Sequence, residues 1–321
     1  MKTLILEASQ IRQIIRIDRA VQEVEEAFRL EGLGKTVMPP KVYLDLPDFN
    51  GDFRAMPACL AGGAALKWVS VYPENPQKNL PTVIGTIILS DPRSGFPLCV
   101  MDGTLITVVR TAAAAAVASK YLARKDSRTL GLVGCGALAD AHIKAISSVT
   151  DISQVAVYCP SKEKIERLAG QNPDLAVHAA SLEAVAQTDI LTTLTPSTTP
   201  VVPAEIVGKG THINAVGADA AGKQELDPSI LGNAKVIVDD ERQATHSGEI
   251  NVPLRAGQFS ADQIHAKLGQ VVAGIEEGRE GDELTLFDST GLAIQDVAVA
   301  RHVFEEAKTA GLGTEINLVP E

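Results

Sequence analysis

The 321-residue sequence predicts an α/β protein that combines a doubly wound parallel sheet with a discontinuous α+β domain. Three observations predict this architecture. The chain exceeds the roughly 100 to 200 residues of a typical single domain. After Ser127, short apolar runs alternate with helical segments, which is typical of parallel sheets. Residues 42–100 consist instead of β-rich runs separated by Pro, Asn and Gly, which favours a mostly antiparallel sheet.

Residues 1–125 are expected to form most of the α+β domain. Its first clear element is an amphipathic helix from Asp18, DRAVQEVEEAFRLEGLG, with a capping Asp, apolar side chains at helical spacing and a terminal Gly. The expected strands that follow are KVYLDL, AALKWVSVY, TVIGTIILSD and PLCVMDG. From Arg110, RTAAAAAVASKYLARK is rich in the strongest helix former and predicts a linking helix.

Residues 126–290 are expected to form the parallel-sheet domain. Helical segments such as SKEKIERLAG and SLEAVAQ separate its candidate strands. A final helix within residues 291–321 should return to the first domain and complete it. The candidate strands are 129–133, 154–158, 175–178, 189–194, 212–216, 235–239 and the run ELTLFD.

The composition restricts the class of partner. A net charge of -11 disfavours nucleic acids and anionic membranes, which attract basic surfaces. No run approaches the ~20 apolar residues of a membrane span, so we expect a cytoplasmic protein that binds a small metabolite. The four cysteines (Cys59, Cys99, Cys135 and Cys159) form no CxxC pair and are expected to be reduced and mostly packed. The histidines lack spacings such as HExxH, so we expect no metal.

A glycine signature follows the first candidate strand of the second domain. Gly134, Gly136 and Ala139 form GxGxxA between an apolar strand and a helix. The first Gly permits a tight turn, the second allows close approach of a pyrophosphate, and Ala139 allows close helix packing. The surrounding strand candidates favour a Rossmann dinucleotide site over the alternative, a tight turn in an ordinary α/β domain.

The residues about 20 positions later predict the type of dinucleotide. Rossmann domains that bind NAD usually place an Asp or Glu there to accept hydrogen bonds from the adenosine ribose. Here Cys159 occupies that position, and Ser161 and Lys162 follow. The absence of a carboxylate slightly favours NADP over NAD, although Lys162 can also be read as a solvated charge at a helix start.

Three further polar residues interrupt apolar contexts. Lys67 could point into a pocket and bind a carboxylate or polarise a carbonyl, but a snorkelling surface lysine fits the same spacing. Arg110 could bind an anion at a helix start or be an ordinary surface residue. Asp219 follows a predicted parallel strand, where such sheets bind ligands, or it simply forms a turn.

Many segments in order resemble the ornithine cyclodeaminase and mu-crystallin family, nearly end to end. They are MPPKVYLDL, FRAMPACL, LKWVSVYPENP, LPTVIGTIILSDPRSGFPLCVMDGTLIT, RTAAAAAVASKYLARK, GCGALA, INAVGADAAGKQELD and FDSTGLAIQDVAVA. Within the family the chain is most similar to the archaeal-type alanine dehydrogenases. The resemblance implies a homodimer whose residues before the glycine turn form the substrate and dimerisation domain.

The resemblance also implies residue roles. Lys67 and Asp219 match the family's catalytic lysine and aspartate, and Lys41 and Arg110 match residues that bind the substrate carboxylate. Arg54 stands where cyclodeaminases have a glutamate for the distal ammonium of ornithine, so a small 2-oxo acid is the expected substrate. Cofactor contacts are implied for Thr82, Arg110, Gly134, Gly136, Ala137, Leu138, Thr195, Val216, Lys223 and Ser289.

These roles predict an NAD(P)-dependent L-amino acid dehydrogenase, with alanine dehydrogenase as the leading candidate. Its substrates would be a 2-oxo acid such as pyruvate, with ammonia, and the corresponding amino acid. Cys159 favours a second possibility, an NADPH-dependent cyclic imine reductase. Ornithine cyclodeaminase activity and non-catalytic binding, as in crystallin-type relatives, are weaker alternatives, the last because Lys67 and Asp219 are both present.

Overall fold

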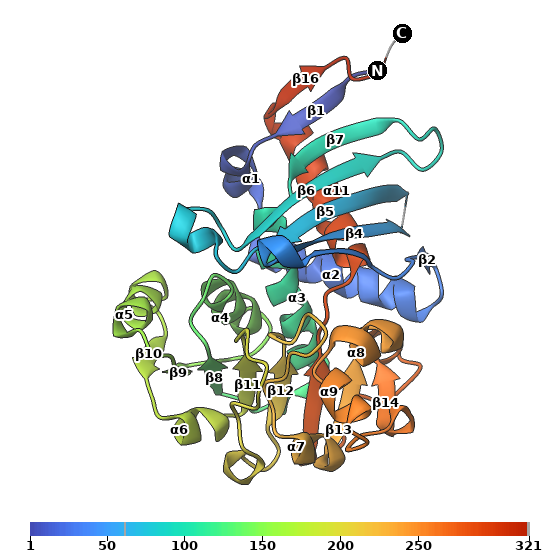
Figure 1. Cartoon of the computed structure of the whole chain (residues 1–321). Coiled ribbons are helices and arrows are strands. Elements are labelled where there is room, and N and C mark those ends of the chain that lie inside the picture. The colour runs from blue at the N-terminus through green and yellow to red at the C-terminus, as the bar shows by residue number, and fades with distance from the viewer. Residues whose placement is uncertain (61, 320–321) are drawn as a thin grey trace. The chain divides into compact units, whose positions relative to one another are not determined.

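Two eight-stranded sheets organise the computed structural model, which describes residues 1–60 and 62–319 (Figure 1). Each sheet belongs to one of two units. Unit 1 comprises Met1–Arg110 and Leu292–Glu321, and unit 2 comprises Thr111–Gly291.

The sheet of unit 1 has the order β16-β1-β7-β6-β5-β4-β2, with β3 also paired to β4. The neighbours from β4 to β7 are antiparallel, as the sequence predicts, whereas β1 pairs parallel with β7. The strands are β1 Thr3–Leu6, β2 Thr36–Val37, β3 Val42–Leu46, β4 Gly51–Leu60, β5 Gly63–Val71, β6 Val83–Ser90, β7 Pro97–Asp102 and β16 Thr314–Ile316.

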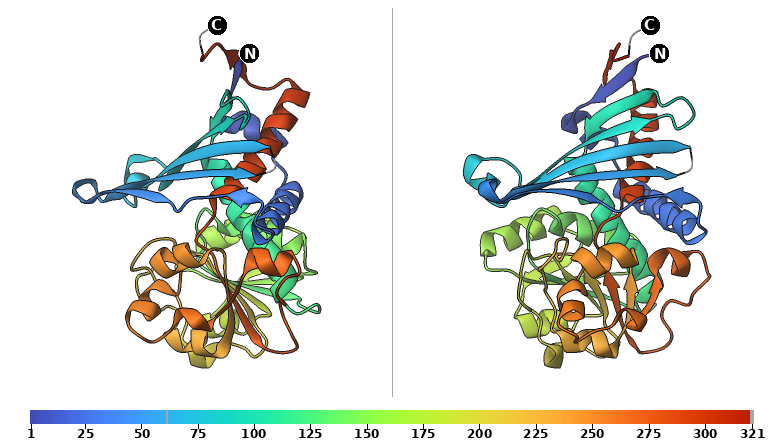
Figure 2. Two further views of the ribbon diagram at one scale, coloured as in Figure 1. Left: turned by 90° about the vertical axis from the view of Figure 1, so that its right-hand side faces the viewer. Right: turned by 45° about the vertical axis from the view of Figure 1, so that its right-hand side comes forward.

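One face of this sheet is covered by helix α11, Ala293–Ala310, which contacts β4, β5 and β6 (Figure 2). Helix α2, Ile17–Gly32, packs against α11 and buries the apolar stripe predicted from its spacing, which includes Val24 and Phe28. Unit 1 also contains α1 Ala8–Ile14 and the 3₁₀ turns η1 Pro47–Phe49 and η2 Asn75–Lys78.

The sheet of unit 2 has the order β10-β9-β8-β11-β12-β15-β13-β14, and all its neighbours are parallel. The reversal of strand order at β8 is the signature of a doubly wound Rossmann sheet. The predicted fold class is therefore confirmed. The strands are β8 Thr129–Val133, β9 Gln154–Tyr158, β10 Ala176–Ala179, β11 Ile190–Thr193, β12 His212–Ala215, β13 Ala234–Val238, β14 Ile264–Lys267 and β15 Leu284–Asp288.

The helices of unit 2 connect these strands, and several begin at a capping side chain, such as Ser161 before α5. They are α4 Ala139–Ser147, α5 Lys162–Gln171, α6 Leu182–Ala186, α7 Pro228–Asn233, α8 Glu241–Ser247, α9 Asn251–Arg255 and α10 Leu268–Val272, with 3₁₀ turns η3 Ala204–Ile206 and η4 Ala261–Gln263.

Helix α3, Thr104–Leu122, begins six residues before the predicted start at Arg110. The carboxylate of Asp102 accepts the backbone N–H groups of Thr104 and Leu105, which satisfies donors that a helix start leaves open. This cap lets the helix include a β-branched segment that has no strong helical signal. The helix is long and apolar enough to cross a membrane, but most of it is buried inside the protein.

The expectation that the cysteines are reduced is wrong for two of them. Cys135 and Cys159 form a disulfide with a Cα–Cα distance of 5.8 Å, whereas Cys59 and Cys99 are free. The two half-cystines lie 24 residues apart in sequence, but each follows one of two paired parallel strands, β8 and β9. Parallel pairing places the ends of these strands side by side, which cysteine spacing alone does not reveal.

Candidate functional site

Lys67 lies on the covered face of β5. Its side chain is 1% exposed, while that of Trp68, the next residue, is 42% exposed on the opposite face. The alternation of the strand therefore selects the buried position over the surface one. The ammonium Nζ donates to Oδ1 of Asp296 at 2.9 Å and to Oγ1 of Thr107 at 3.2 Å.

Asp296 joins Lys67 to the predicted anion-binding residue Arg110. Nε of Arg110 donates to Oδ1 of Asp296 at 3.1 Å, and Nη1 donates to Oε1 of Gln295 at 3.1 Å. All four side chains are buried, so one carboxylate lies between two buried cations. Sequence reasoning missed Asp296 and Gln295. The signal was a charged and an amide residue within the apolar segment GLAIQDVAVA.

The environment of Lys67 lowers its pKa from 10.5 to about 7. Burial is the largest cause because it disfavours the charged ammonium, and the positive charge of Arg110 adds to it. The carboxylate of Asp296 acts in the opposite direction and keeps the pKa from falling further. A lysine with a pKa near neutrality can both donate and accept a proton at physiological pH.

Three other predicted residues lie in unit 1. Lys41 is half-buried, and its charge contributes to the lowered pKa of Lys67. Arg54 is 5% exposed; its Nε and Nη2 donate to the two carboxylate oxygens of Asp52 at 2.7 and 3.1 Å. Its charge is thus paired with a carboxylate, and the sequence alone did not show this partner. Thr82 accepts the backbone N–H of Tyr72 through its carbonyl.

The glycine turn of unit 2 has the geometry of a dinucleotide cradle. Gly134 has φ of +108°, and a Cβ there would lie 3.0 Å from the carbonyl oxygen of Leu194. A Cβ on Gly136 would meet no atom within 4 Å, so the backbone is open to a ligand. Ala137 is exposed and Leu138 is half-buried beside it, while Ala139 is fully buried at the start of α4. These residues fit a pyrophosphate at a helix N-terminus.

The end of β9 lies beside this turn, since the backbone N–H of Gly134 donates to the carbonyl of Tyr158 at 3.0 Å. Cys159 is bonded to Cys135, so no carboxylate stands at the usual ribose position. The hydroxyl of Ser161 accepts the N–H of Lys164 and caps α5. Lys162 is exposed as the first residue of that helix.

Asp219 lies in the loop after β12, and its carboxylate Oδ1 pairs with Nζ of Lys223 at 2.5 Å. Both side chains are partly exposed. The same C-terminal edge of the sheet carries the other predicted residues, Thr195 after β11, Val216 after β12 and Ser289 after β15. Doubly wound sheets bind ligands at this edge.

Buried carboxylates that sequence reasoning missed hold these loops. Glu225 accepts the N–H groups of Thr195 at 2.6 Å and Gly217 at 2.8 Å. Glu249 in turn accepts the N–H of Glu225, and Asp288 accepts the N–H of Glu249. Burial raises the pKa of Glu225, raises that of Glu249 well above its usual range, and raises that of Asp288 to about 8. The loops that carry Thr195 and Asp219 are therefore held in place by the buried side chain of Glu225.

The structure thus brings Lys67 and Arg110 together within unit 1, and places Asp219 and the glycine turn in unit 2. His142 and His212 are fully buried, and burial lowers their pKa values to about 4 and about 3. Within residues 1–60 and 62–319, no group of three or more His, Cys, Asp or Glu side chains could hold a metal ion.

The chain is similar to known proteins over nearly its whole length. The model of the ornithine cyclodeaminase/mu-crystallin family matches residues 1–311. An alanine dehydrogenase of Archaeoglobus fulgidus is 50% identical over 319 residues, which is 98% of each chain. A solved archaeal alanine dehydrogenase dimer with bound NAD superimposes with a TM-score of 0.97 at 49% identity, covering 99% of this chain and 100% of that one.

A second solved structure, the Δ1-pyrroline-2-carboxylate reductase of Thermococcus litoralis in complex with NADH and L-proline, has a TM-score of 0.94. It is 36% identical, and the match covers 98% of this chain and 100% of that one. Since a family model spans nearly the whole sequence and close relatives match end to end, the chain belongs to the ornithine cyclodeaminase/mu-crystallin family.

Proposed function

We propose that this protein is an NAD(P)-dependent L-amino acid dehydrogenase that interconverts L-alanine with pyruvate and ammonia in the cytoplasm. The observation that carries the proposal is Lys67, a buried lysine with a pKa of about 7 held between Asp296 and Arg110. Such a group suits proton transfer at a carbonyl or amine. The likeness to alanine dehydrogenase over 98% of the chain supports this choice of substrate.

Each site residue has a role in this proposal. Arg110 and Lys41 bind the substrate carboxylate, because a guanidinium and an ammonium both form charge-assisted hydrogen bonds with it. In the reductive direction Lys67 polarises the keto oxygen of pyruvate and donates a proton. Asp219 is the second proton-transfer group and accepts protons as ammonia adds and water leaves. Its Oδ1 accepts a hydrogen bond from Nζ of Lys223, which fixes the position of the carboxylate.

A bound nicotinamide cofactor would supply the hydride for reduction at Cα. The residues of unit 2 would hold it: the glycine turn takes the pyrophosphate, and the C-terminal edge of the sheet takes the nicotinamide half. Two relatives with solved structures contain NAD or NADH, which supports a nicotinamide dinucleotide as the cofactor.

Substrate class is tested with a panel of 2-oxo acids plus ammonia, cyclic imines and ornithine, each with NADH or NADPH. We expect pyruvate with ammonia to be converted fastest, and replacement of Arg54 by Glu to narrow its advantage over ornithine, because the new carboxylate attracts the distal ammonium. Arg93→Glu makes the same charge change at an exposed turn and should leave the ratio unchanged.

Two other results of that panel would reject the proposal. Faster reduction of a cyclic imine would make the protein an imine reductase, the function named for the Thermococcus litoralis relative. Faster conversion of ornithine to proline and ammonia would make it a cyclodeaminase.

Cofactor preference forms a second test. Because position 159 has no carboxylate, we propose a kcat/KM for NADPH at least equal to that for NADH. Cys159→Asp should shift the ratio towards NADH by repelling the 2'-phosphate. The assay contains a dithiol reductant, so that Cys135 is a thiol in both proteins. Strong discrimination for NADH by the unmodified protein would contradict the proposal.

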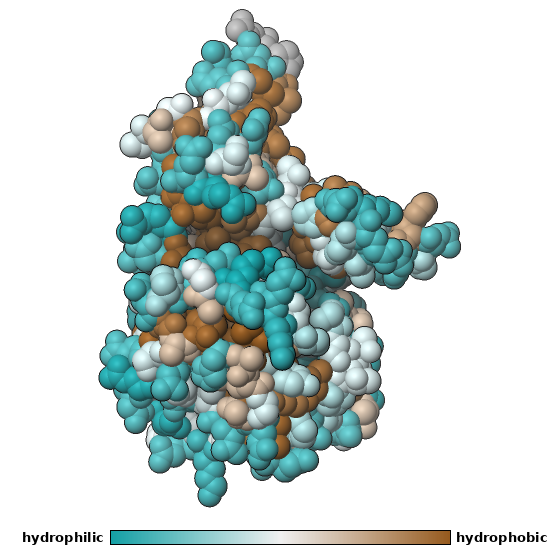
Figure 3. Space-filling model, turned by 90° about the vertical axis from the view of Figure 1, so that its left-hand side faces the viewer, coloured by the Kyte–Doolittle hydropathy of each residue, from teal (hydrophilic) through white to brown (hydrophobic). Residues whose placement is uncertain are grey.

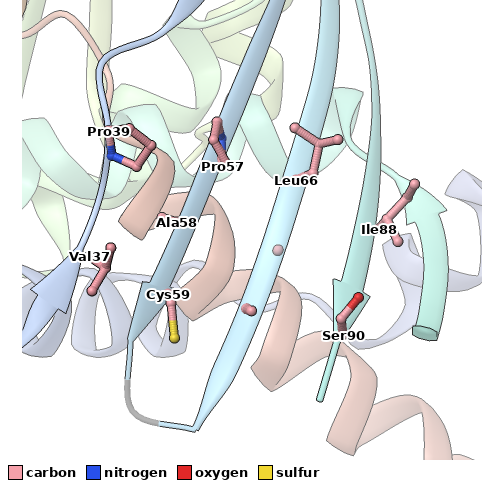
Figure 4. A pocket seen from close by; sticks show the side chains of 10 residues that line it. Val37, Pro39, Pro57, Ala58, Cys59, Leu66, Ile88 and Ser90 are labelled. Atoms are coloured by element: carbon pink, nitrogen blue, oxygen red, sulfur yellow. The ribbon is translucent and has the colours of Figure 1, made fainter. Parts of the chain in front are cut away.

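We also propose that unit 1 forms a homodimer through the sheet face that α11 does not cover. This face exposes Trp68, Ile84 and Ile88 at about two fifths of their surface. It contains an apolar pocket of about 410 Å³ whose lining includes Pro57, Leu66 and Ile88 (Figure 4). Figure 3 shows hydrophobic surface on the part of the molecule that carries the chain termini. Exposed apolar area of this kind marks interfaces between proteins.

Sedimentation checks the dimer. We expect a dimer at micromolar concentration and a shift to monomer for Ile88→Lys, since a buried, unpaired ammonium at the interface is costly. The control Ile275→Lys introduces the same charge at an exposed isoleucine of unit 2 and should remain dimeric. A monomeric unmodified protein would be the contrary result.

A further inference from the structure

The disulfide joins the two turns that the proposed cofactor would contact. Cys135 stands between Gly134 and Gly136 in the glycine turn, and Cys159 directly follows β9. The hydrogen bond from Gly134 to Tyr158 links the same two segments one residue earlier. The covalent bond therefore closes the gap between the pyrophosphate-binding turn and the position where Rossmann domains bind the ribose hydroxyls.

We propose that Cys135 and Cys159 form a reversible thiol–disulfide site that controls binding of the adenosine half of the dinucleotide to unit 2. The dithiol form binds the dinucleotide, and the disulfide form binds it more weakly. This inference rests on the proposed use of a nicotinamide dinucleotide. The reaction partners of this site are the dithiols and disulfides of the cell.

Sterics and hydrogen bonding explain the direction. The bonded sulfur atoms bridge the gap at a Cα–Cα distance of 5.8 Å and carry no donor for a ribose oxygen. After reduction, each thiol can rotate away from the other, and Cys159 gains an S–H group that can donate and accept weak hydrogen bonds. The ribose then has both space and a polar neighbour.

The exposure of the two cysteines makes the bond accessible from one side. Cys135 is 4% exposed, whereas Cys159 is half-buried, so Cys159 is the more accessible of the two residues to an external thiolate. The free Cys99 differs because it is 0% exposed, and burial raises the pKa of its thiol to about 12. A thiol that is buried and protonated is inert towards exchange.

The exchange balances as a two-electron reduction. A thiolate of the dithiol attacks Sγ of Cys159, the Cys135–Cys159 bond breaks, and Cys135 leaves as a thiolate. The second thiolate of the reagent then attacks the mixed disulfide, releasing Cys159 and the oxidised cyclic reagent. The protein gains two electrons and two protons. Its fold survives because the ladder between β8 and β9 and the hydrogen bond from Gly134 do not depend on the disulfide.

The test uses the full-length protein in two forms, one treated with oxidised glutathione and one with dithiothreitol, each freed of reagent. Maleimide labelling after denaturation, read by mass, should find two thiols in the first form and four in the second. Fluorescence titration without substrate should then give a Kd for NADPH and for NADH at least about fivefold higher in the oxidised form. Cys135→Ser should give the lower Kd after both treatments, and Cys59→Ala should keep the difference.

A second measurement does not depend on fluorescence. In a glutathione redox buffer, added NADPH should shift the thiol count towards four, because a ligand that prefers the dithiol form must stabilise it. Equal Kd values, tighter binding by the oxidised form, or four thiols after both treatments would overturn this site while leaving the proposed function intact. Absence of dinucleotide binding in both forms would overturn the two together.

Discussion

Replacement of Lys67 by Ala should lower kcat/KM for reductive amination by about 100-fold to 10,000-fold, the usual range for a positioned general acid. Alanine has no group that can donate a proton in place of Nζ, and the position is 1% exposed, so bulk water has little access to it. Dinucleotide binding, measured by nicotinamide fluorescence, should survive, because the glycine turn belongs to the other unit. Loss of both reductive amination and dinucleotide binding would show that Lys67 is a structural residue.

The pH dependence gives an independent test of the same role. With a pKa of about 7, Lys67 is charged below this pH and neutral above it. Reductive amination needs the charged form, so its kcat/KM should fall as pH rises through about 7. Oxidative deamination needs the neutral form and should rise over the same range. Lys78→Ala removes an exposed lysine of unit 1 and should leave both profiles unchanged.

Replacement of Asp296 by Asn should have the second largest effect. The carboxylate raises the pKa of Lys67 against the effects of burial and Arg110, so its removal lowers that pKa further. Lys67 then loses its proton below neutral pH. A fall of one unit in this pKa reduces the charged fraction at pH 7 from about one half to about one tenth. At pH 7 we therefore expect reductive amination to slow by at least about fivefold, and the descending limb of the pH profile to move to lower pH.

Stability should fall as well. Asn leaves the buried guanidinium of Arg110 without its anion, and Lys67 stays buried only by giving up its proton. Breaking a buried ion pair costs about 3–5 kcal/mol. Denaturant unfolding measures this loss. Glu305→Gln, at an exposed position of the same helix, is the matched control and should change neither property. A slower enzyme with an unshifted pH profile would show that Asp296 acts only on stability.

The pattern of the sequence predicts the second unit well. The run TLGLV coincides with β8, QVAVY with β9, and the helical segment after Ser161 with α5. Strands buried on both faces appear as continuous apolar runs, and helices between them appear as charged segments with capping residues. The predicted start of α3 was six residues too late, because the observed start is capped by the carboxylate of Asp102, which accepts the backbone N–H of Thr104.

The sequence predicted only some of the residues of the candidate site. Lys67 and Arg110 could be named from their apolar contexts, but a lysine in an alternating strand fits a surface position equally well. The choice depends on which face of β5 is covered by α11, a helix more than 200 residues later in the chain. Nothing in the sequence indicated that the carboxylates of Glu225, Glu249 and Asp288 are buried, since acidic residues are usually exposed.

The sequence by itself determined the Rossmann sheet, the glycine turn and the family, because periodicity and turn chemistry are local properties written in consecutive residues. Only the tertiary structure decided that Asp296 lies against Lys67, 229 residues away, and that Cys135 and Cys159 meet. The physical reason is that a buried charge or thiol acquires its chemistry from its neighbours. Desolvation, an opposite charge and a second sulfur all act over a few ångströms, and packing brings them there from distant parts of the chain.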